Sequence, residues 1–332
     1  MHRVVFKGTG SYLPERVVPN SYFETIVETT DEWITTRTGI KERRMIASGQ
    51  AMSDLATPAA QRALEAAGVP PEELDLIIIG TSTGDMLSPS TGCLVQNNLG
   101  AFKAVAFDVN AACPGFIYGL AVARKFMQDG SHRLALVVGG EIVSNRIDFE
   151  DRATCVLFGD GAGAAVLEAV PESEPVGLPG GLLSAHIRSN GALWELLYVP
   201  GGGSRHPPTH EMIDRRLQFV KMQGNEVFKH AVRAMTESAE QALASNGLTS
   251  ADVDWFIPHQ ANMRIMEAVA KKLDIPMEKV VITVHKYGNN SAATIPIALD
   301  EAVREGRVKR GDLVLCCSFG AGFVWGSALL RY

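Results

Sequence analysis

The sequence predicts an α/β protein made of two similar halves, and three observations lead to this prediction. Short apolar runs, many rich in β-branched residues, alternate with stretches that have the periodicity of amphipathic helices. The order of these runs in the first half of the chain recurs in the second half. The 332 residues are 46% apolar and 20% charged, which is typical of a chain with a substantial core. We therefore expect mostly buried sheets covered by helices.

Four strands and a long helix are predicted in the first half. The strand-like runs span residues 76–81, 104–109, 134–139 and 162–167. Residues 54–67 have helical periodicity. Their apolar members share one face: Leu55, Ala59, Ala63 and Ala67. Gly68 follows directly and is positioned to end this helix.

The second half repeats this plan, starting with the link between a helix and the next strand. One helix is predicted to end at Gly68 and another at Gly247, and an aspartate opens the next strand seven residues later in both halves. Residues 105–126 and 280–303 then each contain an apolar strand, a tight turn of small residues and a helix. Another strand, a Gly-rich turn and a last strand follow in both halves.

Four correspondences in the same order indicate an internal duplication. Residues 171–208, which are rich in Pro and Gly, contain the connection between the halves. We expect one half at residues 1–175 and the other at residues 176–332, with functional residues at the turns where they meet.

Charge and composition exclude several classes of protein. The net charge of −6 argues against a general nucleic-acid binder. No stretch approaches the ~18 consecutive apolar residues of a membrane span, and the N-terminal segment lacks the long apolar run of a signal peptide. The five cysteines are odd in number and lie in apolar surroundings, as reduced thiols do. We expect a cytoplasmic protein that binds neither nucleic acid nor membrane.

Neither a metal nor a permanently bound cofactor is expected. The chain has no Cys-x-x-Cys pair, and the prolines between His206 and His210 prevent both imidazoles from sharing a helical face. Residues 159–164 approximate a dinucleotide-binding glycine pattern, but a β-branched strand follows them instead of a helix. Residues 201–204 are Gly-rich but lack the lysine of a phosphate-binding loop.

Cys113 is the candidate nucleophile because it lies between a predicted strand and a predicted helix. Small residues before it permit a tight turn, and Pro114 suits the first helical position. At a helix N-terminus the partial positive charge lowers the pKa of a thiol, and free N–H groups can stabilise an oxyanion. The alternative is a small buried residue, which fits the other four cysteines well.

The second half supplies two candidate partners for this thiol. His259 follows the predicted strand Trp-Phe-Ile-Pro, and Asn289 lies in the turn that matches the Cys113 turn in the repeat. If a pseudo-twofold axis relates the halves, these turns converge. A thiol and two neutral hydrogen-bond donors suit acyl transfer followed by carbanion chemistry.

The chain resembles the β-ketoacyl-acyl-carrier-protein (ACP) synthase III family of the thiolase-like superfamily over essentially its whole length. The matching motifs lie at residues 31–34, 37–40, 112–116, 159–162, 224–228, 258–262 with Arg264, 288–289 and 319–323. The resemblance implies a thiolase-like fold whose duplicated α/β halves form five layers, α-β-α-β-α. It also implies an acyltransferase that condenses an acyl-CoA primer with malonyl-ACP to initiate fatty-acid synthesis.

By this resemblance, Cys113 takes the acyl group as a thioester, and His259 and Asn289 stabilise the enolate that forms as malonyl-ACP loses CO2. Donors aimed at charge that develops only near the transition state accelerate such a step. The backbone N–H groups of Cys113 and Ala321 would hold the thioester oxyanion, and Phe319 would shield the site. An alanine stands at 321 where related enzymes often have glycine.

The resemblance also assigns binding residues and partners. Seven residues would line the CoA channel: Thr29, Trp33, Arg37, Arg152, Asn225, Phe228 and Asn262. A basic strip would dock the acidic carrier protein through Lys229, Arg264, Lys271 and Lys272, together with Arg233, although such charges are usually a solvated face. Trp33 could alternatively be a half-buried anchor. A homodimer is expected.

The acyl pocket is where the chain departs from acetyl-selective relatives. They commonly have a bulky aromatic residue in this segment, often across a dimer interface, whereas this chain offers Leu87 or Ser88. A longer or branched primer would then fit. Three alternative functions remain. They are a related condensation (alkylquinolone-type or head-to-head), a Cys-His thioester hydrolase with His259 as general base, and a non-catalytic scaffold.

Overall fold

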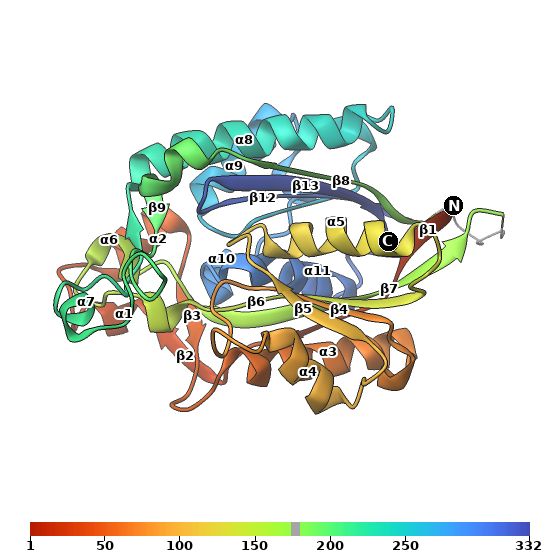
Figure 1. The fold of residues 1–332 in the computed structure, drawn as a ribbon. Coiled ribbons are helices and arrows are strands. Elements are labelled where there is room, and N and C mark those ends of the chain that lie inside the picture. The colour runs from red at the N-terminus through yellow and green to blue at the C-terminus, as the bar shows by residue number, and fades with distance from the viewer. Residues whose placement is uncertain (174–179) are drawn as a thin grey trace.

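The computed structural model describes residues 1–173 and 180–332. A layer of helices lies between two sheets, and a further helix layer covers the outer face of each sheet (Figure 1). This is the predicted α-β-α-β-α arrangement. The predicted boundary between residues 175 and 176 lies outside the described residues.

Each half contributes one of the two large sheets. The first sheet has the order β1 (His2–Tyr12), β7 (Asp160–Pro171), β6 (Leu134–Ile142), β4 (Leu76–Gly80), β5 (Val105–Val109). The second, read in the same direction, has the order β8 (Gly181–Ser189), β13 (Val324–Arg331), β12 (Leu313–Gly320), β11 (Trp255–Pro258). Two small pairs of strands complete the list: β2 (Arg16–Pro19) with β3 (Glu42–Met45), and β9 (Leu197–Tyr198) with β10 (Lys221–Met222).

Strand directions are also the same in both sheets. β6 pairs antiparallel with β7 and parallel with β4, as β12 does with β13 and β11. β1 and β8 close one edge by antiparallel pairing to β7 and β13. At the other edge β5 pairs parallel with β4, and a parallel bridge joins Val280 to Phe256 of β11. The topology therefore confirms the predicted duplication.

The two aspartates predicted to open corresponding strands make the same contacts. Asp75 Oδ2 accepts the N–H of Leu134 at 3.0 Å, and Asp254 Oδ2 accepts the N–H of Leu313 at 2.8 Å. The N–H of each aspartate donates to the carbonyl of the same leucine, at 2.9 and 3.0 Å. These paired bonds join the start of each strand to its neighbour in the sheet, so the repeated spacing has a structural cause.

The helices divide among the layers as Figure 1 shows. α5 (Gly115–Met127) and α11 (Thr294–Arg304) form the middle layer, α3 (Met52–Ala67) and α4 (Thr91–Leu99) cover the first sheet, and α8 (Gly224–Ala244) and α9 (Met263–Lys272) cover the second. The remaining helices are α1 (Asn20–Phe23), α2 (Asp31–Thr38), α6 (Arg152–Cys155), α7 (His210–Asp214) and α10 (Val284–Tyr287). Gly68 ends α3 with φ 64°, as predicted.

The middle layer packs against both sheets, so its helices are apolar on more than one face. Phe116 and Ile117 of α5 lie in one core cluster with Ile295 and Leu299 of α11 and with strands of both sheets. The glycine-rich segment 159–164 lies in β7 except for Gly159, so a strand and not a helix carries it, as predicted, and it serves this packing. A Cβ atom on Gly163 would lie 2.7 Å from the backbone nitrogen of Ile297, so glycine lets α11 approach the sheet.

Several boundaries differ from the prediction. β7 runs to Pro171 and β6 to Ile142, beyond their apolar runs, because both edges of β7 are paired. α8 ends at Ala244, and Gly247 lies in the turn after it. Among the described residues, no helix is both long and apolar enough to cross a membrane.

Candidate active site

Cys113 lies in a sharp turn between β5 and α5. Ala112 has φ 45°, a left-handed conformation that costs an L-residue roughly 1–2 kcal/mol. Pro114 is the N-cap of α5 and not its first residue, one position from the prediction. The turn therefore places the thiol just before the helix starts.

The matching turn of the second half has the same backbone feature. Ser291 has φ 49° and lies three positions before Thr294, the first residue of α11. Ala112 lies three positions before the first residue of α5. In this register Ala292 corresponds to Cys113, and Asn289 corresponds to Asn110. The two turns are therefore structural counterparts, as the repeat predicts.

Glycines bring these turns together. A Cβ atom on Gly139 of β6 would lie 2.3 Å from the carbonyl oxygen of Ala292. One on Gly115 would lie 3.1 Å from the Cβ of Ala292, and one on Gly80 would lie 2.4 Å from the carbonyl carbon of Gly115. Side chains at Gly139 and Gly115 would push the two turns apart, and one at Gly80 would push the start of α5 away from β4.

One cavity of about 1500 Å³ is lined by residues from both halves. Cys113, His259 and Asn289 all line it, and so do Phe319 and Ala321. The structure thus brings together the three residues that the sequence singled out. Within the described chain, no group of three His, Cys, Asp or Glu side chains could hold a metal ion.

The loop that holds Ala321 passes close to the backbone of Cys113. A Cβ atom on Gly320 would lie 2.9 Å from the Cys113 nitrogen. Phe319 is buried and packs on Phe323 with ring centroids 4.6 Å apart. Glycine at position 320 lets the loop approach the Cys113 backbone closely. The rings of Phe319 and Phe323, which flank the loop, pack on each other.

The Asn289 side chain is oriented by its own turn. Its Oδ1 accepts the N–H of Ser291 at 2.9 Å. Because a backbone N–H can only donate, the side-chain oxygen faces the turn and the NH2 group is left for another partner. The backbone of Asn289 bridges to the segment before β7, with its N–H donating to Leu157 at 2.9 Å.

His259 follows β11 and is buried. Its backbone N–H donates to the carbonyl of Cys317 at 2.9 Å, and its Nδ1 lies 2.7 Å from Thr294 Oγ1. The hydroxyl of Thr294 also donates to the carbonyl oxygen of Ser291 at 3.0 Å, so its one proton is shared between this oxygen and Nδ1. Burial lowers the pKa of His259 to about 3, so the imidazole is neutral at physiological pH.

Cys113 differs from the prediction, which expected a lowered pKa. Burial raises the pKa of the Cys113 thiol to about 12, a hydrogen bond from Ser291 opposes this rise, and the charge of Glu141 adds to it. Removal of the thiolate from water outweighs the favourable position before α5. The resting nucleophile is therefore a thiol, and the predicted direction of its pKa shift is wrong.

Two residues next to Cys113 were missed by the sequence analysis. Ser291 Oγ lies 3.5 Å from Cys113 Sγ and 3.4 Å from Glu141 Oε1. Glu141 is a fully buried carboxylate at the end of β6. A glutamate inside the otherwise apolar run 134–142 was the available signal, because an acid is rarely buried there without a partner.

The predicted CoA residues divide into two groups. Trp33, Arg37, Asn225, Phe228 and Asn262 line the cavity, whereas Thr29 and Arg152 are not among its lining residues. Arg152 still contacts Trp33, because its guanidinium lies 4.9 Å from the centroid of the indole ring. Arg37 lies 4.6 Å from the same ring. A half-buried indole flanked by two guanidinium groups thus lines the cavity.

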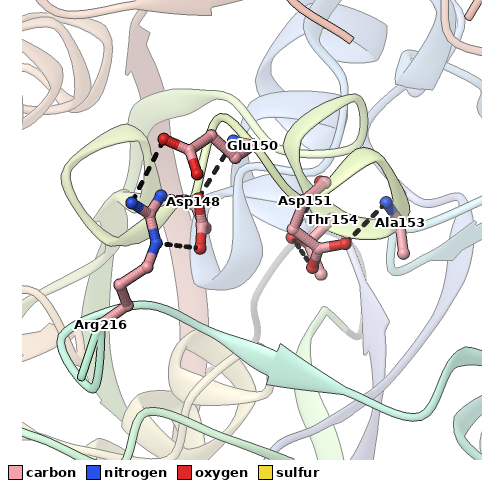
Figure 2. A network of polar contacts seen from close by, with 6 residues as sticks. All are labelled: Asp148, Glu150, Asp151, Ala153, Thr154 and Arg216. Atoms are coloured by element: carbon pink, nitrogen blue, oxygen red, sulfur yellow. Dashed lines mark hydrogen bonds and ion pairs between the residues drawn. The ribbon is translucent and has the colours of Figure 1, made fainter. Parts of the chain in front are cut away.

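Polar contacts near Arg152 hold the channel segments in place (Figure 2). Asp151 caps α6, accepting the N–H of Ala153 at 3.0 Å and the hydroxyl of Thr154 at 2.7 Å. Arg216, which follows α7, donates through Nε to Asp148 at 2.9 Å and through Nη1 to Glu150 at 3.3 Å. We call the contacts of Arg216 with Asp148 and Glu150 the Arg216 clasp. The clasp joins residues 211–216 of the second half to the segment before α6.

The predicted basic strip lies on α8 and α9. Lys229 pairs with Glu226 at 2.7 Å, and Arg233 pairs with Glu237 at 3.3 Å. Arg264, Lys271 and Lys272 form no ion pair with any described residue. Lys229 and Arg264 line the cavity, and Lys271 and Lys272 do not. The unpaired charge of the strip is thus concentrated on α9.

Of the predicted acyl-pocket residues, Leu87 lines the cavity and Ser88 does not. The side chain of Leu87 is 94% exposed in the single chain, so it is not packed against its own half.

A thiol at a strand-to-helix turn that shares one cavity with a neutral His and an Asn from the duplicated half is typical of the thiolase-like condensing enzymes. Solved structures support this class. The chain superimposes on 3-oxoacyl-ACP synthase III from Aquifex aeolicus with a TM-score of 0.90 and 47% identity, covering 100% of both chains. The corresponding enzyme from Pseudomonas aeruginosa gives a TM-score of 0.90 and 39% identity over 99% and 98% of the two chains.

Sequence comparisons identify the family. The family described as 3-oxoacyl-ACP synthase III matches residues 107–191, and its C-terminal counterpart matches residues 243–332. The β-ketoacyl-ACP synthase III of Alkalilimnicola ehrlichii is 53% identical over 98% of both chains, and that of Caldanaerobacter subterraneus is 51% identical over 98% and 96%. The chain belongs to the β-ketoacyl-ACP synthase III family.

Proposed function

We propose that Cys113, His259 and Asn289 carry out the reaction of this family in the present chain. That reaction joins an acyl-CoA primer to the malonyl group of malonyl-ACP and initiates fatty-acid synthesis. In the first step the sulfur of Cys113 attacks the acyl-CoA thioester and CoA leaves. The N–H groups of Cys113 and Ala321 stabilise the oxyanion. The position of the Ala321 loop against the Cys113 backbone supports this assignment.

In the second step malonyl-ACP loses CO2, and the resulting carbanion attacks the acyl-Cys113 thioester. His259 and Asn289 donate hydrogen bonds to the malonyl thioester oxygen as it becomes an enolate. The Asn289 amide offers its NH2 group because its oxygen is already bound. The hydroxyl proton of Thr294 has two acceptors in reach, the Ser291 carbonyl at 3.0 Å and Nδ1 of His259 at 2.7 Å. In the state in which this proton points to Nδ1, Nε2 carries the imidazole proton and becomes the donor.

The buried position of His259, with Nδ1 2.7 Å from Thr294 Oγ1, is the observation that carries this proposal. A Cys-His hydrolase needs an imidazole that takes a proton from the thiol. Burial lowers the pKa of His259 to about 3, so this ring is a poor base and a suitable neutral donor. The hydrolase alternative is therefore disfavoured. Related condensations that yield other β-keto products would use the same donors.

Mass spectrometry after mixing with labelled acyl-CoA tests the proposal. We expect one acyl group on Cys113, and conversion to 3-oxoacyl-ACP when malonyl-ACP is added. Cys113→Ala is the matched control, because it keeps the cavity and removes the acyl acceptor. Acylation followed only by hydrolysis would favour the hydrolase. No acylation by any acyl-CoA would contradict both functions.

The CoA nucleotide is proposed to bind at Trp33. Arg37 and Arg152 both contact this indole. A flat nucleotide base can stack on an indole ring or on a guanidinium group, so this cluster is suited to bind one. Thr29, Asn225, Phe228 and Asn262 are proposed to contact the rest of the CoA molecule. The acidic carrier protein is proposed to dock on Lys229, Arg264, Lys271 and Lys272.

A homodimer is proposed from the exposed edge of the first sheet. β5 is the edge strand, and Val105 on it is 51% exposed. Phe102, in the connection that leads into β5, is 73% exposed, and Leu87, in the connection from β4 to α4, is 94% exposed. An unpaired edge with apolar neighbours favours pairing with a second chain. Leu87 would then contribute to an acyl pocket that admits primers longer than acetyl.

A cytoplasmic location is proposed from the cysteines. All five are free thiols, as is usual in a reducing compartment.

A further inference from the structure

The segment that contains Asn289 also places a hydroxyl between the thiol and a buried acid. Ser291 Oγ is 3.5 Å from Cys113 Sγ and 3.4 Å from Glu141 Oε1. The left-handed backbone of Ser291, with φ 49°, sets the direction of this side chain. The three residues come from three elements: the turn before α5, the turn before α11, and β6.

The hydrogen bonds around Glu141 indicate which groups donate and which accept along the row Cys113–Ser291–Glu141. The loop after β4 directs donors at the carboxylate: the N–H of Ser82 at 2.9 Å, its hydroxyl at 2.8 Å, and the hydroxyl of Thr83. Thr83 Oγ1 itself accepts the N–H of Ile142, so its proton is directed to Glu141. A carboxylate surrounded by donors is an acceptor.

Ser291 Oγ lies within donor distance of both Cys113 Sγ and Glu141 Oε1, and its single proton can serve only one of them. A carboxylate is a stronger acceptor than a thiol sulfur, so while Cys113 is a thiol the Ser291 proton points to Glu141 and the lone pairs of Ser291 face the thiol. Once Cys113 is a thiolate, Ser291 can donate to the sulfur instead.

Cys113 needs such an acceptor. Burial raises the pKa of its thiol to about 12, so little thiolate exists at physiological pH. His259 is a poor base because burial lowers its pKa to about 3. Among the residues that line the described cavity, the acids are Glu141 and Glu226, and Glu226 is paired with Lys229 on α8. Burial raises the pKa of Glu141, which makes its carboxylate a stronger base.

We infer that Ser291 and Glu141 form a proton relay that serves Cys113 during acylation. This inference rests on the proposed role of Cys113 as nucleophile. As the Cys113 sulfur forms its bond to the acyl carbon, its proton passes to Ser291 Oγ, and the Ser291 proton passes to Glu141. The bond between the acyl carbon and the CoA sulfur then breaks, and its electron pair stays on that sulfur. The proton returns through Ser291 to the CoA sulfur, which leaves as a thiol.

Rapid-quench measurement of Cys113 acylation tests the relay. Glu141→Gln keeps the shape of the side chain and removes the base, and Ser291→Ala removes the bridge. General base catalysis typically contributes ~10²–10⁴-fold, so we expect acylation to slow by about 10²-fold or more in both variants. Ser82→Ala is the matched control, because it removes a hydroxyl from Glu141 without interrupting the row. The acylation rate of Ser82→Ala should fall much less than that of the two relay variants.

The dependence on pH separates a relay from a structural role. The ionisable groups at this point are Cys113, Glu141 and His259, and the hydroxyls of Thr81, Ser82, Thr83 and Ser291 surround them. Without the relay, acylation depends on thiolate formed by hydroxide, and the thiolate fraction rises tenfold per pH unit below the thiol pKa. The deficits of Glu141→Gln and Ser291→Ala should therefore shrink as the pH rises. A deficit of constant size at every pH, or none, would overturn the relay.

Decarboxylation of malonyl-ACP provides the second measurement. Both relay variants should decarboxylate malonyl-ACP at nearly the wild-type rate, because the step does not need the Cys113 proton. Equal losses in acylation and decarboxylation would indicate a damaged site and would contradict the relay. Absence of acylation in the wild-type protein would instead contradict the role of Cys113 itself, so the two failures can be told apart.

Discussion

At the scale of single residues, burial decides the protonation states of the site. It keeps Cys113 a thiol and His259 a neutral imidazole, by raising one pKa to about 12 and lowering the other to about 3. The two groups are therefore unsuited to a thiolate–imidazolium pair. They suit a two-step reaction in which Cys113 attacks the acyl thioester and His259 later donates a hydrogen bond to the enolate.

The pH dependence of decarboxylation should reflect the lowered pKa of His259. An imidazole stays neutral above its pKa, so the contribution of His259 should persist as the pH falls through 6.5, the ordinary value. It should fade only as the pH approaches about 3. Decarboxylation of malonyl-ACP by wild type and His259→Ala, compared over pH, measures this contribution. A midpoint near the ordinary value would contradict the account.

Thr294 should control the orientation of the His259 proton. Thr294→Val removes the hydroxyl 2.7 Å from Nδ1, and a hydrogen bond of about 1 kcal/mol corresponds to a roughly fivefold slower decarboxylation. Acylation of Cys113 should change little. Thr294→Ser keeps the hydroxyl and is the matched control. Equal effects of Val and Ser would show that the hydroxyl has no such role.

Sequence reasoning found Cys113, His259 and Asn289 because each follows a strand or lies in a repeated turn. It missed Glu141 and Ser291, since their meeting depends on a close approach between β6 and the turn before α11. That approach requires Gly139 to lie against Ala292, a tertiary contact that no local pattern encodes. The direction of the Cys113 pKa shift was also wrong, because desolvation is a property of the folded cavity.

At the scale of elements, periodicity predicted the duplication and the central strands correctly. The strand expected at the start of residues 280–303 is wrong, because only a single bridge forms at Val280 and α10 follows. The outer strands β1 and β8 were not predicted. Apolar runs reflect burial on both faces of a sheet, and the aspartates at 75 and 254 reflect bonds that both sheets share. Channel elements were harder to predict. The small pair β9–β10 and the Arg216 clasp depend on contacts between distant segments.

The Arg216 clasp should affect CoA binding more than chemistry. Its loss would free residues 211–216 from the segment that carries Arg152. We expect Arg216→Ala to raise the KM for acyl-CoA severalfold with little change in kcat. Arg215→Ala is the matched control, because Arg215 forms only an exposed pair with Glu211 at 3.3 Å. Equal effects of the two variants on KM would contradict a role for the clasp.

At the scale of the whole molecule, an acidic protein presents a basic surface on one helix of its second half. Lys271 and Lys272 lie outside the cavity lining, so they can be tested apart from CoA binding. Reversal of both charges to Glu should raise the KM for malonyl-ACP at low salt and leave acylation by acyl-CoA unchanged. Lys309→Glu is the control. It is exposed and precedes β12, whereas the site lies beyond the end of that strand. Equal effects would contradict docking on α9.

In this account the two halves divide two roles: the first half supplies the nucleophile Cys113, and the second half supplies the enolate donors His259 and Asn289. Single-turnover measurement of both half-reactions in three variants tests this division most directly. Cys113→Ala should lose acylation and still decarboxylate malonyl-ACP. His259→Ala and Asn289→Ala should acylate Cys113 at near wild-type rates and lose decarboxylation by ~10²-fold or more, as for the loss of an oxyanion donor. Equal loss of both half-reactions in the His259 and Asn289 variants would contradict the account.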